Sequence, residues 1–256
     1  MNMTTMLALL HRDMRVARRE LRSFLLRVAL QPLLFTFIFG YVMPRQGLVA
    51  SNYTNTLLPG ILALSMTLSG MQAVALPLAI DFGWTKEIED RLLAPISMNG
   101  VVIEKILVGI IQSTLAGLIV LPLAWLMMGR NVNLNIPHPF LLVAVALLSS
   151  WLFAAFGMVI GTFTEPQHIA LIFQVVMTPM IFFGCAYYPW TTLRVVPWFQ
   201  KFVLINPLVY ASEGFRAALT AQLPHMPLAL IFGGLVTFCV LFTFLGLRQF
   251  TRRALD

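Results

Sequence analysis

Charged residues are scarce in this chain. Only 11% of its 256 residues are Asp, Glu, Lys or Arg, against roughly 25% in soluble domains, and 59% are hydrophobic. A protein of this composition could bury a core, but it could not cover that core with polar surface. Lipid must therefore surround much of it, which indicates an integral membrane protein.

The motifs for nucleotide hydrolysis and metal binding are missing. A P-loop needs a glycine followed by Lys and then Ser or Thr, whereas Lys86 follows Thr, Lys105 follows Glu and Lys201 follows Gln. The two cysteines lie far apart, and the four histidines show no metal-ligand spacing such as HExxH. We therefore expect a chain that is not an enzyme and that binds no cofactor itself.

The net charge of +7 is placed as in membrane proteins rather than nucleic-acid binders. Arginines precede the first apolar stretch and follow the last one, whereas a nucleic-acid binder needs a basic soluble face. With the N-terminus inside, twelve of the seventeen Lys and Arg residues lie on the inner side. The positive-inside rule thus predicts that both termini are cytoplasmic, in the inner membrane of a bacterium, and we expect no nucleic-acid partner.

Six apolar stretches approach or exceed the length of a membrane span. A hydrocarbon core of about 30 Å needs ~20 apolar residues in a helix, and a helix satisfies all of its own backbone amides there. The short alternating segments of a β-barrel are missing. The sequence predicts one all-α transmembrane domain over residues 1–256 with six transmembrane helices. The predicted spans are 24–43, 57–80, 106–128, 140–163, 169–188 and 227–247.

A basic amphipathic helix is predicted over residues 4–23. Apolar residues such as Leu10, Met14 and Leu21 recur at three- and four-residue steps, with arginines between them. Such a helix lies at an anionic headgroup surface. It is either a membrane-surface anchor or a gate element beside the transport pathway. The arginines expected at this surface are Arg15, Arg18, Arg19 and Arg22.

The segment 81–97 carries both signs of charge between the second and third predicted spans. Trp84, Ile88 and Leu92 fall four residues apart on one stripe of a short helix, which Pro95 ends. Charges cover the rest of its surface, which suits docking to a soluble protein; a solvated connecting loop is the alternative. The residues expected to make the contact are Trp84, Glu87, Ile88, Asp90, Arg91 and Leu92.

The long connection before the last span is too apolar for free solvent. Non-helical backbone at membrane depth needs protein or a water-filled cavity around it, so we expect short re-entrant helices over 190–222 on the outer side. Glu213 and Arg216 are three residues apart and can pair on one helical face. They form either a purely structural ion pair or a contact of the gate or substrate. The candidate gate residues are Asn206, Pro207, Tyr210, Glu213 and Arg216.

Four features together make the chain resemble type-2 ABC transporter permeases. They are the basic N-terminal helix, the run Glu89-Asp90-Arg91-Leu92-Leu93-Ala94-Pro95-Ile96-Ser97 followed by Lys105, the triplet Tyr188-Pro189-Trp190, and Asn206-Pro207-Leu208-Val209-Tyr210 followed by Glu213 and Arg216. The resemblance implies a second permease copy, two copies of a separate P-loop ATPase that hydrolyses ATP, and a coupling role for the helix around Trp84. Within this family, the chain is similar to the branch that exports drugs, lipooligosaccharides and polysaccharides.

The energy source separates the function classes. Ion-coupled carriers usually bury charges inside their helices, and the cores of the predicted spans carry none apart from Arg27 near one end. We therefore expect the permease subunit of an ATP-driven exporter of an amphipathic drug or a glycolipid- or polysaccharide-type substrate. A stand-alone channel or ion-coupled secondary transporter is the alternative. An intramembrane enzyme would need a nucleophile and base facing each other across helices, which the sequence does not offer.

Overall fold

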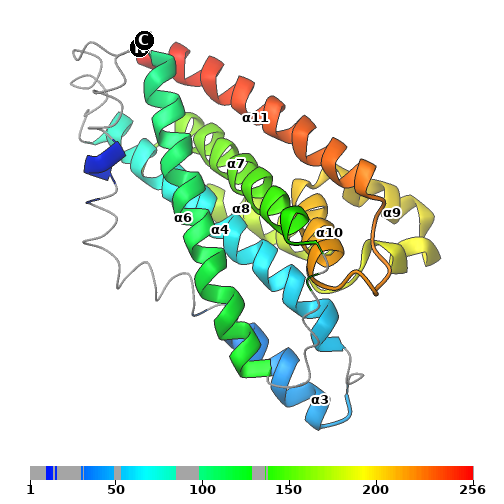
Figure 1. Ribbon diagram of the computed structural model, residues 1–256. Helices are drawn as coiled ribbons and strands as arrows, with labels where there is room; N and C mark the ends of the chain where they lie inside the picture. Colours follow the sequence, from blue (N-terminus) through cyan, green and yellow to red (C-terminus); the bar gives the residue numbers. More distant parts are fainter. Residues whose placement is uncertain are drawn as a thin grey trace.

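The computed structural model describes residues 10–13, 15, 30, 32–48, 53–84, 98–128, 136 and 138–255. Throughout this part of the chain the regular elements are helices (Figure 1), which confirms the predicted all-α class. In chain order they are η1 (Thr36–Val42), α3 (Met43–Arg45), α4 (Tyr53–Gly83), α6 (Met98–Met128), α7 (Pro139–Phe163), α8 (Ile169–Phe182), η3 (Trp190–Val195), α9 (Pro197–Phe202), η4 (Val203–Ile205), α10 (Pro207–Leu219) and α11 (Leu228–Leu255).

Four helices of the described ranges are long and apolar enough to cross a membrane: α4, α6, α7 and α11. Helix α8 is apolar but has 14 residues, about 21 Å of helix. The first predicted span, 24–43, is described only at residue 30 and from residue 32 onward, where it is helical and includes the π-helical turn η1. The count of six spans therefore stays a prediction.

Helices α4 and α6 run past their predicted spans at one shared end. Each has 31 residues, about 46 Å of helix. The extension brings Asp81, Glu104 and Lys105 into helices, where 8%, 0% and 3% of each residue is exposed. These two helices therefore continue beyond the predicted spans 57–80 and 106–128, into the charged residues where the apolar runs stop. Residues 85–97 of the mixed-charge segment lie outside the described residues.

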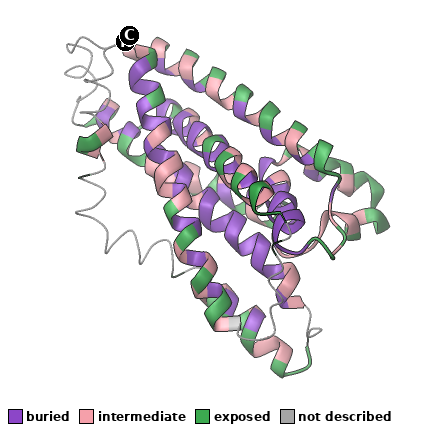
Figure 2. Cartoon of the chain, viewed as in Figure 1, coloured by how far each residue is buried: buried purple, intermediate pink, exposed green. Residues whose placement is uncertain are grey.

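Helix α4 is the centre of the bundle. It packs against α6, α7 and α10, and α7 packs in turn against α11 (Figure 1). Twenty of the 31 residues of α4 are buried, whereas α8 buries only Ile169, Met177 and Met180. Figure 2 shows the same division, with buried residues gathered on α4 and α7 and exposed residues on the outer faces of α6, α9 and α11.

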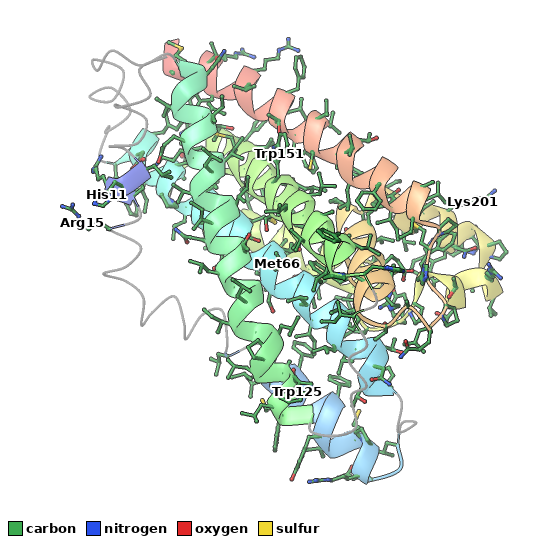
Figure 3. All side chains as sticks on the ribbon, viewed as in Figure 1. His11, Arg15, Met66, Trp125, Trp151 and Lys201 are labelled. Carbon is green, nitrogen blue, oxygen red and sulfur yellow. The ribbon has the colours of Figure 1, made fainter. Side chains whose placement is uncertain are left out.

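Small residues and hydroxyl groups join α4, α6 and α7. A Cβ atom on Gly157 or Gly161 would lie 2.5 or 2.7 Å from a carbonyl oxygen of α4, so only glycine allows this approach. Midway along α4, the carbonyl oxygen of Met66 (labelled in Figure 3) accepts a hydrogen bond from Ser113 Oγ at 2.8 Å. Ser150 Oγ donates to Ser113 Oγ at 3.1 Å. These contacts tie the three helices together across their middle.

The turn after α8 crosses α4 at Gly60. A Cβ atom at this position would lie 1.7 Å from the carbonyl oxygen of Ala186 and 2.4 Å from its carbonyl carbon. The obstacle is backbone, which cannot move aside as a side chain can. The close contact fixes the path of the turn over the first part of α4.

We expect Gly60→Ala to lower the free energy of unfolding by about 3 kcal/mol or more, because the backbone of residue 186 must be displaced. The matched control is Gly233→Ala in α11, where an added Cβ meets no atom within 4 Å. Thermal unfolding of the two variants in the same detergent measures the difference. Equal melting temperatures would contradict the tight crossing.

Candidate functional site

Charged side chains gather at the two opposite ends of α4. One end, called here the charged end, holds Asp13, Asp81 and Lys105. In Figure 1 it lies at the upper left, where the last turns of α4 come close to the helical residues 10–13 and to α6. The other, called here the capped end, holds the short helices from η3 to α10 and the pair Glu213–Arg216. The long helices connect the two sites.

At the charged end, one ammonium group lies between two carboxylates. Lys105 Nζ lies 3.0 Å from Asp13 Oδ2 and 3.2 Å from Asp81 Oδ2. The Lys105 side chain is 4% exposed, so water screens these attractions little. Asp13 belongs to the predicted N-terminal amphipathic helix, of which residues 10–13 and 15 are described and helical. The cluster therefore fastens that segment to the ends of α4 and α6.

Asp81 on α4 and Lys105 on α6 lie at the two ends of the predicted coupling segment. Asp81 is the first residue of the segment 81–97 and Lys105 follows its last residue by eight positions. Trp84, the last residue of this segment that the structure describes, is 66% exposed. Arg15, labelled in Figure 3 beside His11, is also exposed. The other predicted residues of these two segments lie outside the described part of the chain: Glu87, Ile88, Asp90, Arg91, Leu92, Arg18, Arg19 and Arg22.

At the capped end, Glu213 and Arg216 pair as predicted, and both side chains are 0% exposed. Glu213 also accepts the backbone N–H of Trp190 at 2.9 Å and that of Met226 at 2.7 Å. Its carboxylate thus receives donors from three places along the chain. Such a set of donors stabilises a charge that burial alone would strongly disfavour.

The guanidinium of Arg216 binds backbone carbonyl oxygens of two other segments. Nη2 donates to the carbonyl oxygen of Cys185 at 3.0 Å, in the turn that crosses Gly60, and approaches the Thr56 carbonyl oxygen on α4 at 3.5 Å. Neither charged side chain has surface that a substrate could touch in this conformation. The geometry therefore favours the structural interpretation of the pair over a direct substrate contact.

The Asn-Pro-Leu-Val-Tyr motif builds the start of α10. Asn206 Oδ1 caps the helix by accepting the N–H of Leu208 at 3.0 Å, and Pro207 occupies the first turn. The Asn206 amide donates to the Met180 carbonyl oxygen at 2.8 Å, which ties α10 to α8. Tyr210 donates its hydroxyl to the Leu204 carbonyl oxygen at 2.9 Å. The motif thus positions Glu213 and Arg216.

The short helices expose an apolar face. Trp190 Nε1 donates to the Gln200 carbonyl oxygen at 3.1 Å, and the Gln200 amide donates back to the Trp190 carbonyl oxygen at 3.2 Å. This exchange folds η3 against α9. Outward from it, Val195, Trp198 and Ile205 are 87%, 71% and 71% exposed. An exposed apolar face of this kind suits contact with lipid rather than with water.

Helix α8 exposes a polar pair among apolar residues. Gln174 Nε2 donates to Thr178 Oγ1 at 3.1 Å, and both residues are exposed. Their exposed neighbours include Leu171 and Val175, each 64% exposed. Polar side chains in membrane helices usually face protein or water rather than lipid. This face of α8 is therefore suited to a second protein surface or a water-filled path.

Sequence reasoning missed several residues of both sites. Asp13, Asp81 and Lys105 were not site candidates. Opposite charges at the two ends of the connection between α4 and α6 are a signal that could have found Asp81 and Lys105, whereas no pattern marks Asp13. The donors and acceptors around the buried pair are backbone groups of Trp190, Met226 and Cys185, which no side-chain pattern marks. Among the described residues, no group of three or more His, Cys, Asp or Glu residues could hold a metal ion.

Comparison with protein-family models gives one match: the model described as ABC-2 type transporter aligns with residues 4–220. Comparison with curated proteins gives no match. The aligned region contains both charge clusters, from Asp13 to Arg216, and ends before α11 begins.

We expect Arg216→Met to lower the free energy of unfolding by about 3–5 kcal/mol, because it leaves the Glu213 carboxylate buried without its cation. The matched control is Arg194→Met, which removes an exposed arginine from η3 at the same end. Thermal unfolding in lipid nanodiscs compares the two. If both variants melt together, Arg216 does not stabilise the capped end.

Proposed function

We propose a specific role for this chain, which belongs to the ABC-2 type transporter family: two copies pair with two copies of a separate ATPase and export an amphipathic drug or a glycolipid- or polysaccharide-type substrate. The chain is a multi-pass membrane permease of this family, and its 256 residues carry no P-loop sequence. We infer that its force comes from a separate ATPase polypeptide. This force would enter the bundle at the neighbouring ends of α4 and α6 and would be transmitted along α4.

The observation that carries the proposal is the Asp13–Lys105–Asp81 cluster at the two sides of the coupling segment. A displacement of residues 85–97 enters the bundle through α4 and α6, because these helices begin or end beside that segment. The cluster joins the two helix ends to each other and to the N-terminal helix. A push on the segment then moves three elements together.

Helix α4 carries the movement to the capped end. It is continuous over 31 residues, and near its first turn the Thr56 carbonyl oxygen lies 3.5 Å from Arg216. Arg216 also donates to the Cys185 carbonyl oxygen, and Glu213 accepts the Met226 N–H. The pair therefore connects α4 to both of these segments. Motion of α4 would therefore reorient the whole capped end, which we propose faces the outer side while the charged end faces the cytoplasm.

A second permease copy is supported by α8. This helix buries few residues within one chain and exposes the pair Gln174–Thr178. A second copy, or a substrate path between two copies, would cover these groups away from lipid. The cargo then moves along the face that α8 offers, by alternating access at the interface of the two copies.

The charges buried at the ends of α4 and α6 bear on the alternative of an ion-coupled secondary transporter, but they do not support it. The cores of the predicted spans were expected to carry no charge apart from Arg27, and Asp81 and Lys105 are buried one residue beyond the predicted spans 57–80 and 106–128. Coupling-ion sites of secondary transporters lie near the bilayer midplane. Here the charges lie at one end of α4 and α6 and neutralise each other. This placement supports a mechanical junction rather than an ion-binding site.

We expect the double substitution Glu87→Lys and Asp90→Lys to reduce ATP-driven export at least ten-fold while the chain still inserts in the membrane, because it reverses the charge of the docking surface. Efflux of a fluorescent amphipathic dye and ATP hydrolysis are measured in proteoliposomes with the complete transporter. Normal export by this variant would remove the coupling role. Uphill transport by the purified chain without an ATPase would instead support the stand-alone carrier.

We expect Lys105→Gln to lower export strongly, because Asp13 and Asp81 then lose the ammonium group that lies between them and the contact of the N-terminal helix with α4 and α6 weakens. Lys201→Gln, an exposed lysine of α9 labelled in Figure 3, is the matched control and should export normally. The same proteoliposome assay applies to both. Equal export by the two variants would show that the cluster takes no part in coupling.

A further inference from the structure

The last turn of α11 reaches the end of α7. Arg253 Nη1 donates hydrogen bonds to three carbonyl oxygens there. They belong to Gly161, Thr162 and Thr164, at 3.3, 2.7 and 3.1 Å. The last carbonyl groups of a helix have no partner within the helix, and a cation near them interacts favourably with the helix dipole. Arg253 therefore closes the C-terminal end of α7.

The same guanidinium also holds the end of α4. Its central carbon lies 4.8 Å from the centre of the Phe82 ring, a cation–π contact. Phe82 in turn packs edge-on against Phe250 of α11, with ring centres 5.3 Å apart. One arginine thus contacts two helices other than its own, using its donors for α7 and its planar face for α4.

The turn from α7 to α8 packs directly on the end of α4. A Cβ atom on Gly83 would lie 2.4 Å from Pro166 Cγ and 2.5 Å from its Cδ, so only glycine fits. The next residue, Trp84, is 66% exposed and leads into the coupling segment. The end of α4, the α7–α8 turn and the last turn of α11 therefore meet immediately beside the place where force would enter.

We propose that Arg253 is a positioning residue for coupling: it fastens the ends of α4, α7 and α11 into one body, so that displacement of residues 85–97 moves all three helices. The inference rests on the proposed function. Without these contacts, displacement of residues 85–97 would bend the last turn of α4 but would not move α7 and α11. Arg253 acts through Phe82 and the α7 carbonyl groups, and its role is distinct from that of the Lys105 cluster on α6.

Arginine is the side chain that this position needs. A guanidinium is planar and offers several donors, so it can bind carbonyl oxygens at its edge while its face covers an aromatic ring. The ammonium group of lysine keeps the charge near the end of α7 but has no planar face. Arg253→Lys should therefore retain part of the function, and Arg253→Gln should retain little.

The contact itself is tested first, in the purified chain in lipid nanodiscs. Arg253→Gln should speed amide hydrogen exchange in peptides covering residues 161–168 by about ten-fold or more, because the end of α7 loses its donors. Arg252→Gln removes an exposed arginine from the same turn and should leave exchange unchanged. Unchanged exchange in Arg253→Gln would overturn the inference without touching the proposed function.

Coupling is tested in the complete transporter with its ATPase. Nitroxide labels at position 198, an exposed residue of α9, report the distance between the two capped ends, since both natural cysteines are buried. ATP should shift this distance in the unsubstituted chain and in Arg252→Gln. In Arg253→Gln the shift should fall by more than half while ATP hydrolysis continues, with Arg253→Lys in between.

The outcomes separate the two proposals. No ATP-dependent shift in the unsubstituted chain would overturn both the proposed function and the role of Arg253. A full shift in Arg253→Gln would overturn only the latter. If Arg253→Gln fails to insert, Phe82→Leu keeps the apolar bulk but removes the aromatic face. That variant should also reduce the shift, and a full shift would count against the inference.

Discussion

A buried carboxylate and guanidinium hold the capped end together, and the surrounding segments are arranged to satisfy them. Glu213 and Arg216 have no exposed surface, so each must find all of its partners within the protein. The start of α4, the turn after α8, the start of η3 and Met226, two residues before α11, all converge on this pair. An unsatisfied charge there would cost several kcal/mol, so the pair restricts these four segments to one mutual arrangement.

At both ends of the molecule buried charges find partners within the protein, but the partner groups differ. At the charged end, side chains provide both signs of charge, and Lys105 binds carboxylates from two elements. At the capped end, one charge pair binds mostly backbone groups. Between them, the serine hydroxyls and close glycine contacts keep α4, α6 and α7 from sliding. A bundle joined at both ends and at its middle is suited to transmit displacement, as the proposed coupling to a separate ATPase requires.

The sequence predicted the features that depend on side-chain pattern. Glu213 pairs with Arg216, because a spacing of three residues places them on one face of a helix. The sequence did not predict that α4 and α6 continue beyond the spans 57–80 and 106–128 to include Asp81 and Lys105, because hydropathy falls there. It also missed the partners of Glu213, because backbone amides far along the chain carry no residue-specific signal. Contacts of this kind become visible only in three dimensions.

The position of Met226 has a consequence for biosynthesis. A ribosome releases the chain from its N-terminus, so Glu213 emerges before the backbone amide of residue 226 that binds its second oxygen. Until residue 226 has been synthesised, the carboxylate lacks one of its donors, and its entry into apolar surroundings is unfavourable. Completion of the capped end must therefore wait for a backbone group thirteen residues further along the chain. Translation order thereby sets the order of assembly at this end of the molecule.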